Sequence, residues 1–287
     1  MKYTDEHKEK IAFNIASFAI QAMMYEVSCF PSPGLVSPVS NGAHKDMDFY
    51  TFIDSTCALS SYFVKFVREG FKEVSCKQLF RNIREIGIEA EKDMFLKTKG
   101  VNTHKGMIFL MGIACAAAGK AVSDGRSFEA IRKIIVEMTA GIVKSELENI
   151  DLNKELSYGE KIYVDYKIKG IKGEVEEGMP IVFDFSLKFF DESAELSIND
   201  RLVHTLIGIM QVCEDTNIIH RHSVEILREV QEKAKSIIKA GGMKSCEGRE
   251  MIQNLNEEFI EKNISPGGSA DILGVTVFMD LIRKYIN

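Results

Sequence analysis

The stretch that decides the fold is GMIFLMGIACAAAG, residues 106–119, which contains no charged side chain. Its body, residues 107–118, is apolar on every side, and a helix of this kind is buried inside a protein. The run is also well short of the roughly 20 residues that an α-helix needs to cross a bilayer. We therefore expect it to form the central helix of a core and not a membrane span.

Helical periodicity extends outward from this stretch in both directions. Apolar residues recur at spacings of three and four over Thr4–Ser28, and two more helices are predicted over about Asp48–Glu69 and from about Ser75, whose Ser-Cys-Lys-Gln sequence is typical of a capping box. Further helices are expected near residues 104–121, 127–149, 157–168, 175–196, 199–213, 221–239, 246–262 and 269–285. Residues 181–190 are also compatible with a strand, but their spacing favours a helix. The pattern predicts an all-α fold, a single compact domain of about ten to twelve helices over residues 1–287.

Composition restricts the class of function. The chain has 287 residues, of which 45% are hydrophobic, and its net charge of −6 comes from basic and acidic residues that are mixed along the sequence. This argues against nucleic acid as a partner and favours small-molecule chemistry. The six cysteines form no CxxC pair, and the polar, acidic N-terminus does not resemble a signal peptide. We expect free thiols and a cytoplasmic protein that does not bind a membrane.

The first polar constellation is a long loop between two predicted helices, with Pro31-Ser32-Pro33-Gly34-Leu35-Val36 followed by Asn41-Gly42-Ala43-His44-Lys45-Asp46-Met47-Asp48. Loops of this length in compact domains are often functional. His44, Asp46 and Asp48 place an imidazole beside two carboxylates, which suits cation binding or general-base work. The alternative is that Asp46 or Asp48 caps the next helix.

The second constellation surrounds the start of the buried helix. Glu91 and Asp93 flank the apolar stripe of the preceding helix, and Asn102 or Thr103 can cap the buried one. The basic side chains of His104 and Lys105 would then stand at the positive end of the helix dipole. This placement is tolerable if an anion such as phosphate binds there. The alternative is that both side chains reach solvent.

The third constellation, Asn263-Ile264-Ser265-Pro266-Gly267-Gly268-Ser269-Ala270-Asp271, precedes the last apolar helix. Its glycines allow a close approach of backbone amides to a ligand, and Ser269 can cap the helix, so it is a second candidate anion site. A plain glycine turn explains it equally well. Two weaker segments are Glu214-Asp215-Thr216-Asn217 with Arg221, and Gly170-Ile171-Lys172-Gly173-Glu174.

Together these segments resemble the triphosphoribosyl-dephospho-coenzyme A synthases, which make the prosthetic-group precursor of citrate lyase and malonate decarboxylase. The resemblance extends from about Glu26 to Thr276 and rests on five motifs in the family's order: residues 33–36, 42–47, 100–106, 215–217 and 265–271. Three positions depart from the family's usual residues, namely Ser37, Lys172 and the pair His222-Ser223.

The resemblance implies an all-helical pentosyltransferase. Such an enzyme transfers the 5-triphosphoribosyl group of ATP to the 2′-hydroxyl of 3′-dephospho-coenzyme A and releases adenine. Breaking the N-glycosidic bond develops positive charge on the ribose, so we expect Asp46 and Glu91 to stabilise that charge or deprotonate the hydroxyl. His104 or His44 would then assist the leaving adenine.

The triphosphate calls for Mg²⁺ and for cationic or helix N-terminal contacts. The expected metal ligands are Asp46, Glu91 and Asp271. The expected contacts to the substrates are His44, Lys45, Asn102, Lys105, Asp215, Asn217, Arg221, Gly267, Gly268 and Ser269.

Two other classes of function stay open on the sequence. A metal-dependent all-helical nucleotide phosphohydrolase would use the same carboxylates but would release phosphate or a nucleoside monophosphate. A non-catalytic helical partner protein would leave Asp46, Glu91 and Lys105 apart on the surface. The oligomeric state is also open, with a homodimer among the options.

Overall fold

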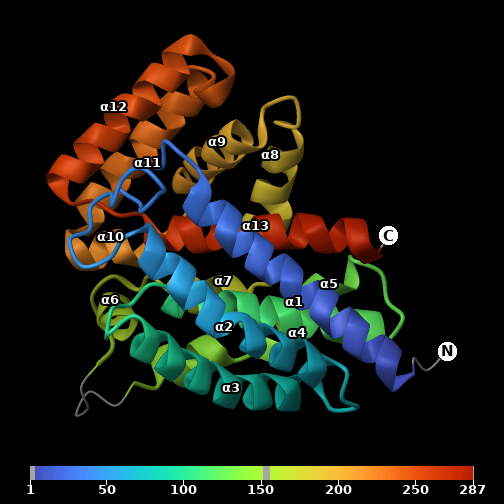
Figure 1. Cartoon of the computed structure of the whole chain (residues 1–287). Helices are drawn as coiled ribbons and strands as arrows, with labels where there is room; N and C mark the ends of the chain where they lie inside the picture. Colours follow the sequence, from blue (N-terminus) through green and yellow to red (C-terminus); the bar gives the residue numbers. More distant parts are fainter. Residues whose placement is uncertain (1–3, 151–155, 287) are drawn as a thin grey trace.

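The computed structural model describes residues 4–150 and 156–286, and within them it is helical throughout, with no strand beyond an isolated bridge between Ser37 and Ser40 (Figure 1). The α-helices are α1 (Asp5–Ser28), α2 (Phe49–Gly70), α3 (Cys76–Lys97), α4 (Lys105–Ser123), α5 (Ala130–Thr139), α6 (Tyr158–Tyr166), α7 (Gly170–Glu176), α8 (Leu187–Asp191), α9 (Ile198–Met210), α10 (Thr216–Arg221), α11 (Val224–Lys239), α12 (Cys246–Lys262) and α13 (Gly267–Ile286). Lys144–Glu148 and Ile181–Ser186 are π-helical, and Gly242–Lys244 is a 3₁₀ turn. The all-α prediction is confirmed, and because α8 and α10 have only five and six residues, the number of longer helices also agrees.

Helix α4 is the centre of the molecule, as the apolar run at residues 106–119 predicts. It packs against α1, α2, α3, α5, α7 and α13, and almost every residue of its body is buried. Among the described residues it is the one helix long and apolar enough to cross a bilayer, but 78% of that stretch lies inside the protein. It is therefore the core helix of a soluble protein.

Two predicted helices are shorter than expected. The helix expected at 127–149 ends at Thr139, and the one expected at 175–196 is interrupted after Glu176. Gly141 and Gly178 have φ angles of +86° and +80°, a left-handed backbone that glycine adopts without strain and that ends a right-handed helix. The helical prediction for residues 181–190 is nevertheless confirmed, as a π-helical turn followed by α8.

The region before α11 also differs from the prediction. The helix expected at 221–239 begins at Val224, capped by Ser223, and the preceding residues form the separate short helix α10. Asp215 caps α10 by accepting a hydrogen bond from the backbone N–H of Asn217, over 3.1 Å. A polar segment that was compatible with a simple turn is therefore a helix start.

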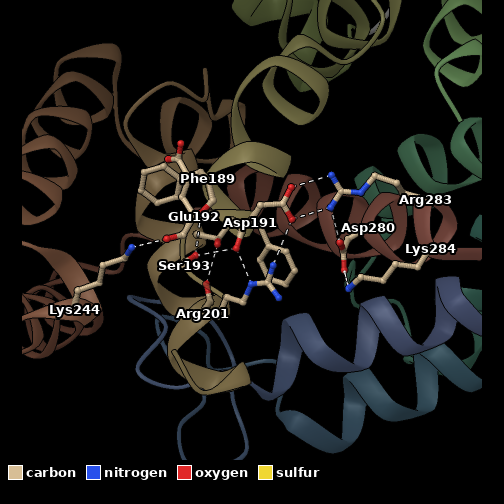
Figure 2. Close-up of polar contacts among 11 residues, drawn as sticks. Phe189, Asp191, Glu192, Ser193, Arg201, Lys244, Asp280, Arg283 and Lys284 are labelled. Carbon is tan, nitrogen blue, oxygen red and sulfur yellow. Dashed lines mark hydrogen bonds and ion pairs between the residues drawn. The ribbon is translucent and has the colours of Figure 1, made fainter. Parts of the chain in front are cut away.

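The C-terminal half of α13 is fixed by a cluster of ion pairs (Figure 2). Asp191, at the end of α8, accepts hydrogen bonds from both terminal nitrogens of Arg283 at 2.8 and 2.7 Å. Arg283 and Lys284 also bind the buried Asp280, and the Arg201 guanidinium lies 3.5 Å from the centroid of the Phe190 ring. Since bidentate pairs of this kind restrict orientation, they hold α13 against α8 and α9.

Candidate active site

The loop between α1 and α2 is held against the connection between α12 and α13. Nε2 of His44 forms a 2.9 Å hydrogen bond with Oγ of Ser265, which lies just before α13. The α2 cap is Asp48, whose side chain accepts from Thr51 in a capping box. Asp46 is not the cap: its side chain is 63% exposed, with Oδ1 3.9 Å from Nδ1 of His44. The cap alternative is thus resolved for both aspartates.

His44 is a neutral imidazole, and only one of its two ring nitrogens forms a hydrogen bond within the described residues. Burial, together with the positive charge of Arg221, lowers its pKa to about 4, although Asp46 opposes the shift. Its Nδ1 is buried and has no hydrogen-bond partner within the described part of the chain. Its contact with Ser265 and the influence of the Arg221 charge on its pKa place the loop next to Arg221 and the start of α13.

The start of α4 carries the second constellation. The N-cap of α4 is His104, which makes no capping hydrogen bond, and not Asn102 or Thr103 as predicted. Asn102 nevertheless accepts a hydrogen bond from the backbone N–H of Lys105 over 3.1 Å. Lys105 is exposed, as the alternative for this residue predicts. It is also paired, because its Nζ lies 2.6 Å from Oε1 of Glu91 on α3. Asp93 accepts from Tyr62 instead. Of the two flanking carboxylates, Glu91 is therefore the one at the start of α4.

His104 is buried, in contrast to Lys105. Only 2% of its surface is exposed, its Nδ1 lies 2.7 Å from Oγ of Ser55, and its ring meets Phe52 edge to face. Burial lowers its pKa to about 3, so the imidazole is neutral at neutral pH. The alternative that His104 reaches solvent is therefore wrong. The imidazole is suited to donate a hydrogen bond but not to titrate near neutrality.

Counting hydrogens assigns the His104 tautomer. Thr103 donates to Oγ of Ser55 over 2.7 Å, and because Ser55 is fully buried its own hydroxyl hydrogen needs an acceptor. The acceptor within reach is Nδ1 of His104. The ring hydrogen is then on Nε2, which is buried and has no partner in the residues that the structure describes.

The start of α13 already holds a carboxylate of the protein. Buried Asp215 accepts hydrogen bonds from the backbone N–H and the hydroxyl of Ser269, at 2.7 and 3.0 Å. Ser269 lies inside α13, so the prediction that it caps this helix is wrong: its hydroxyl donates to Asp215 and does not accept from the helix. The amide of Ser269 is therefore already occupied.

Asp271 links α13 to α4. A Cβ atom on Gly106 would lie 2.1 Å from Oδ2 of Asp271, so the glycine lets this carboxyl lie directly against the start of α4. Burial and the nearby charges of Glu26 and Asp215 raise the pKa of Asp271 well above its ordinary value. Glu26, near the end of α1, is only 6% exposed, and burial raises its pKa to about 8.

These contacts gather the predicted segments at one end of the molecule, opposite the two chain termini (Figure 1). Around the buried groups stand exposed polar side chains: Lys45, Asp46, Asn102, Lys105, Asn217 and Arg221. Lys172 is not among them, because its Nζ pairs with Glu146 at 3.1 Å. A cavity of about 380 Å³ opens beside Gly268 and Thr216, with Lys167 and Lys169 in its wall.

The sequence reasoning missed Glu26 and Ser55. Glu26 follows Ala22 and Met23 at helical spacing on the buried face of α1, where an apolar residue is expected. Ser55 likewise occupies the buried face of α2, four residues before Leu59. A polar residue in register with a core stripe is the signal that would have identified both.

Comparison with known proteins decides the family. Residues 12–287 match the family model described as CitG: ATP:dephospho-CoA triphosphoribosyl transferase. The chain belongs to this family. Its activity is the transfer of the triphosphoribosyl group of ATP to dephospho-CoA, which makes 2′-(5″-triphosphoribosyl)-3′-dephospho-CoA, a precursor of the citrate lyase prosthetic group. The predicted family, reaction and enzyme class are confirmed, in place of the phosphohydrolase and the partner protein.

The relatives of this transferase agree with the family model. A probable 2-(5″-triphosphoribosyl)-3′-dephosphocoenzyme-A synthase of Streptococcus equi subsp. equi is 33% identical, covering 97% of this chain and 99% of the relative. A protein of Lactiplantibacillus plantarum with the same description is 38% identical, covering 93% and 96%. Protein CitXG of Leuconostoc mesenteroides subsp. cremoris is 40% identical over 92% of this chain, which spans only 58% of CitXG. No solved structure matches.

Proposed function

We propose that triphosphoribosyl transfer takes place between the starts of α4 and α13, under the loop that carries His44 and Asp46. The contact of Asp271 with Gly106 supports this placement most directly, because it joins the two helix starts that the sequence assigned to phosphate binding. The hydrogen bond between His44 and Ser265 adds the loop to the same region. A site between several elements is typical of enzymes that bind small molecules.

The two carboxylates assigned to the chemistry differ in their surroundings. Asp46 is exposed and has no role as a cap, so it is available to deprotonate the 2′-hydroxyl of dephospho-CoA. Glu91 is held by Lys105 at the start of α4, where it would stabilise the positive charge that develops on the ribose. We assign the base to Asp46 and the stabilising charge to Glu91.

Cationic side chains around this region would hold the phosphates. Lys45 and Arg221 are exposed, and Lys105 can reach a phosphate by exchanging its contact with Glu91. Asn102, Asn217, Gly267 and Gly268 line the same end and would add polar contacts. The amide of Ser269 is occupied by Asp215, so we give Asp215 and Ser269 the role of shaping the turn.

The two histidines would act on the adenine through hydrogen bonds. Because both imidazoles are neutral, neither supplies a proton as an imidazolium at neutral pH. Nε2 of His104 carries a hydrogen and lacks a partner, so it can donate to a ring nitrogen of the adenine as that nitrogen becomes more basic. His44, fixed by Ser265, would position the loop over the nucleotide.

The residues present fit a requirement for Mg²⁺. The described part of the chain contains no group of three or more His, Cys, Asp or Glu side chains that could hold a metal alone. Magnesium on a nucleotide needs no such cage, because it keeps its waters and uses one or two carboxylates together with substrate phosphates. Among the expected ligands Asp46, Glu91 and Asp271, the last is partly buried and without a protein partner in the described residues. When bound, Mg²⁺ would neutralise charge on the triphosphate.

The test is an assay with ATP, Mg²⁺ and 3′-dephospho-CoA in which adenine and the triphosphoribosylated product are measured by chromatography and mass spectrometry. We expect both products in equal amounts, and adenine formation that depends on dephospho-CoA. Release of phosphate or of a nucleoside monophosphate without adenine would contradict the proposal. We also propose a cytoplasmic location, because all six cysteines are free thiols, as is usual in a reducing compartment.

A further inference from the structure

A pair of carboxyl groups at the start of α4 has no counter-charge. Glu26 comes from the last turn of α1 and Asp271 from the first turns of α13, and α1 packs against both α13 and α4. Within residues 4–150 and 156–286, neither carboxyl group accepts a hydrogen bond or meets a cation, although Glu26 is 94% buried. Burial of an ionised carboxylate without a partner is costly, so this arrangement needs an explanation.

The neighbouring groups leave room for only one kind of partner. Oδ2 of Asp271 fills the space that a side chain on residue 106 would take, so this carboxyl packs directly against the backbone at the start of α4. The third nearby acid, Asp215, is satisfied by Ser269 and Asn217. Lys105, a cation at this helix start, is paired with Glu91. The two carboxyl groups left without a partner are therefore those of Glu26 and Asp271, and burial raises the pKa of both.

We infer that Glu26 and Asp271 together hold a divalent cation at the start of α4, with Glu26 as a ligand from α1 and the triphosphate of ATP completing the coordination. Carboxylate oxygens are the ligands that Mg²⁺ prefers, and two of them with phosphate oxygens and water suffice for its octahedral site. The inference rests on the proposed function for the identity of the phosphate ligand. It moves the main metal ligands from Asp46 and Glu91 to a pair that includes a residue the sequence did not suggest.

The first test measures Mn²⁺ binding in place of Mg²⁺, using the electron paramagnetic resonance signal of free Mn²⁺, with and without inorganic tripolyphosphate. We expect the wild-type protein to bind Mn²⁺ more tightly when tripolyphosphate is present. Glu26→Gln and Asp271→Asn should each weaken that binding at least tenfold. The control Glu89→Gln, on the exposed side of α3, should bind as the wild type does. Unchanged Mn²⁺ affinity in both variants would mean that the two acids share a proton and hold no cation.

The second test needs no variant, so it applies even if Glu26→Gln fails to fold. Fe²⁺ bound in place of Mg²⁺, treated with ascorbate and peroxide, cleaves the backbone close to its site. We expect cleavage near residues 26, 106 and 271 that excess Mg²⁺ suppresses. Cleavage confined to the neighbourhoods of residues 46 and 91 would overturn the inference in favour of the other set of carboxylates.

Failure of this inference and failure of the proposed function give different results. If the wild type releases adenine but shows no cation at Glu26 and Asp271, the transfer stands and the metal assignment is wrong. If the cation binds at this pair but no adenine is released, the metal site stands and the proposed placement of the reaction is wrong.

Discussion

The starts of α13 and α4 were expected to bind anions in the same way, yet they differ in what their carboxylates do. At α13, Asp215 accepts three hydrogen bonds, from the amide and hydroxyl of Ser269 and from the amide of Asn217. At α4, Asp271 lies against Gly106 but accepts no hydrogen bond from the described residues. Both carboxyl groups lie at the positive end of a helix dipole, but only that of Asp215 has hydrogen-bond donors within the described residues. A satisfied acid at a helix start is part of the scaffold, and an unsatisfied one is available to a ligand.

The same contrast is present between Asp48 and Asp46 in the loop before α2, and it predicts the largest effect. Asp46→Asn and Glu91→Gln should each lower turnover at least a hundredfold, about 2.7 kcal/mol, because an amide neither takes a proton nor carries charge. The melting temperature should stay nearly unchanged. The measurement is adenine release at saturating substrates.

The control is Asp48→Asn, since Asn caps a helix about as well as Asp. This variant should keep both its turnover and its stability. If Asp46→Asn turns over like Asp48→Asn, the distinction between cap and free carboxylate does not extend to the chemistry.

The second prediction compares the two helix starts directly in stability. Asp215→Ala should lower the free energy of unfolding by about 3 kcal/mol, because it leaves buried donors without an acceptor where a charged acceptor stood. Asp271→Ala should change it by less than about 1 kcal/mol, since the removed carboxyl has no partner to leave behind. Urea denaturation in the presence of a chelator measures both. Equal losses in the two variants would remove the basis of the comparison.

Sequence patterns located the long helices well because their apolar stripes are regular. The stripe of Leu79, Ile83, Ala90 and Met94 is buried as its spacing predicts, and Ser75 caps α3 as expected. The second half of the predicted capping box is not formed, because the side-chain oxygen of Gln78 accepts hydrogen bonds from Arg81 instead of from the backbone N–H of Ser75. Local signals thus gave the elements but not every side-chain partner.

The site was less accessible to sequence reasoning because its contacts are long-range. Asp215 and Ser269 are 54 residues apart, and their hydrogen bond decides that the turn at α13 is occupied. Met179, which follows Gly178 after the end of α7, has a left-handed φ of +53° that no local signal predicts, since few residues other than glycine adopt that conformation. Glu26 was overlooked because the buried groups beside it, such as Asp271, are far from it in the sequence.

The third prediction concerns Lys105, the exposed cation at the start of α4. Lys105→Ala should weaken ATP binding by about 1.5–3 kcal/mol, roughly tenfold or more, which is the range of charge-assisted hydrogen bonds. Calorimetry with ATP and Mg²⁺ measures it, and Lys92→Ala, an exposed lysine on α3, is the control. If ATP affinity is the same in both variants, Lys105 serves only Glu91, and the start of α4 holds no phosphate.

The last and smallest prediction tests whether His104 is held neutral at this helix start. An unfolded histidine takes up a proton below about pH 6.5, whereas the folded pKa of His104 is about 3. Between these values the unfolded chain binds more protons, so stability is full above pH 6.5 and falls as the pH is lowered, by up to about 1.4 kcal/mol per pH unit for this residue. His104→Gln should reduce the slope of unfolding free energy against pH by about that amount between pH 4.5 and 6. The exposed His222 provides the control substitution, His222→Gln. A slope in His104→Gln as steep as in the wild type would show that His104 accepts a proton in the fold, and the start of α4 would then carry a positive charge against its dipole.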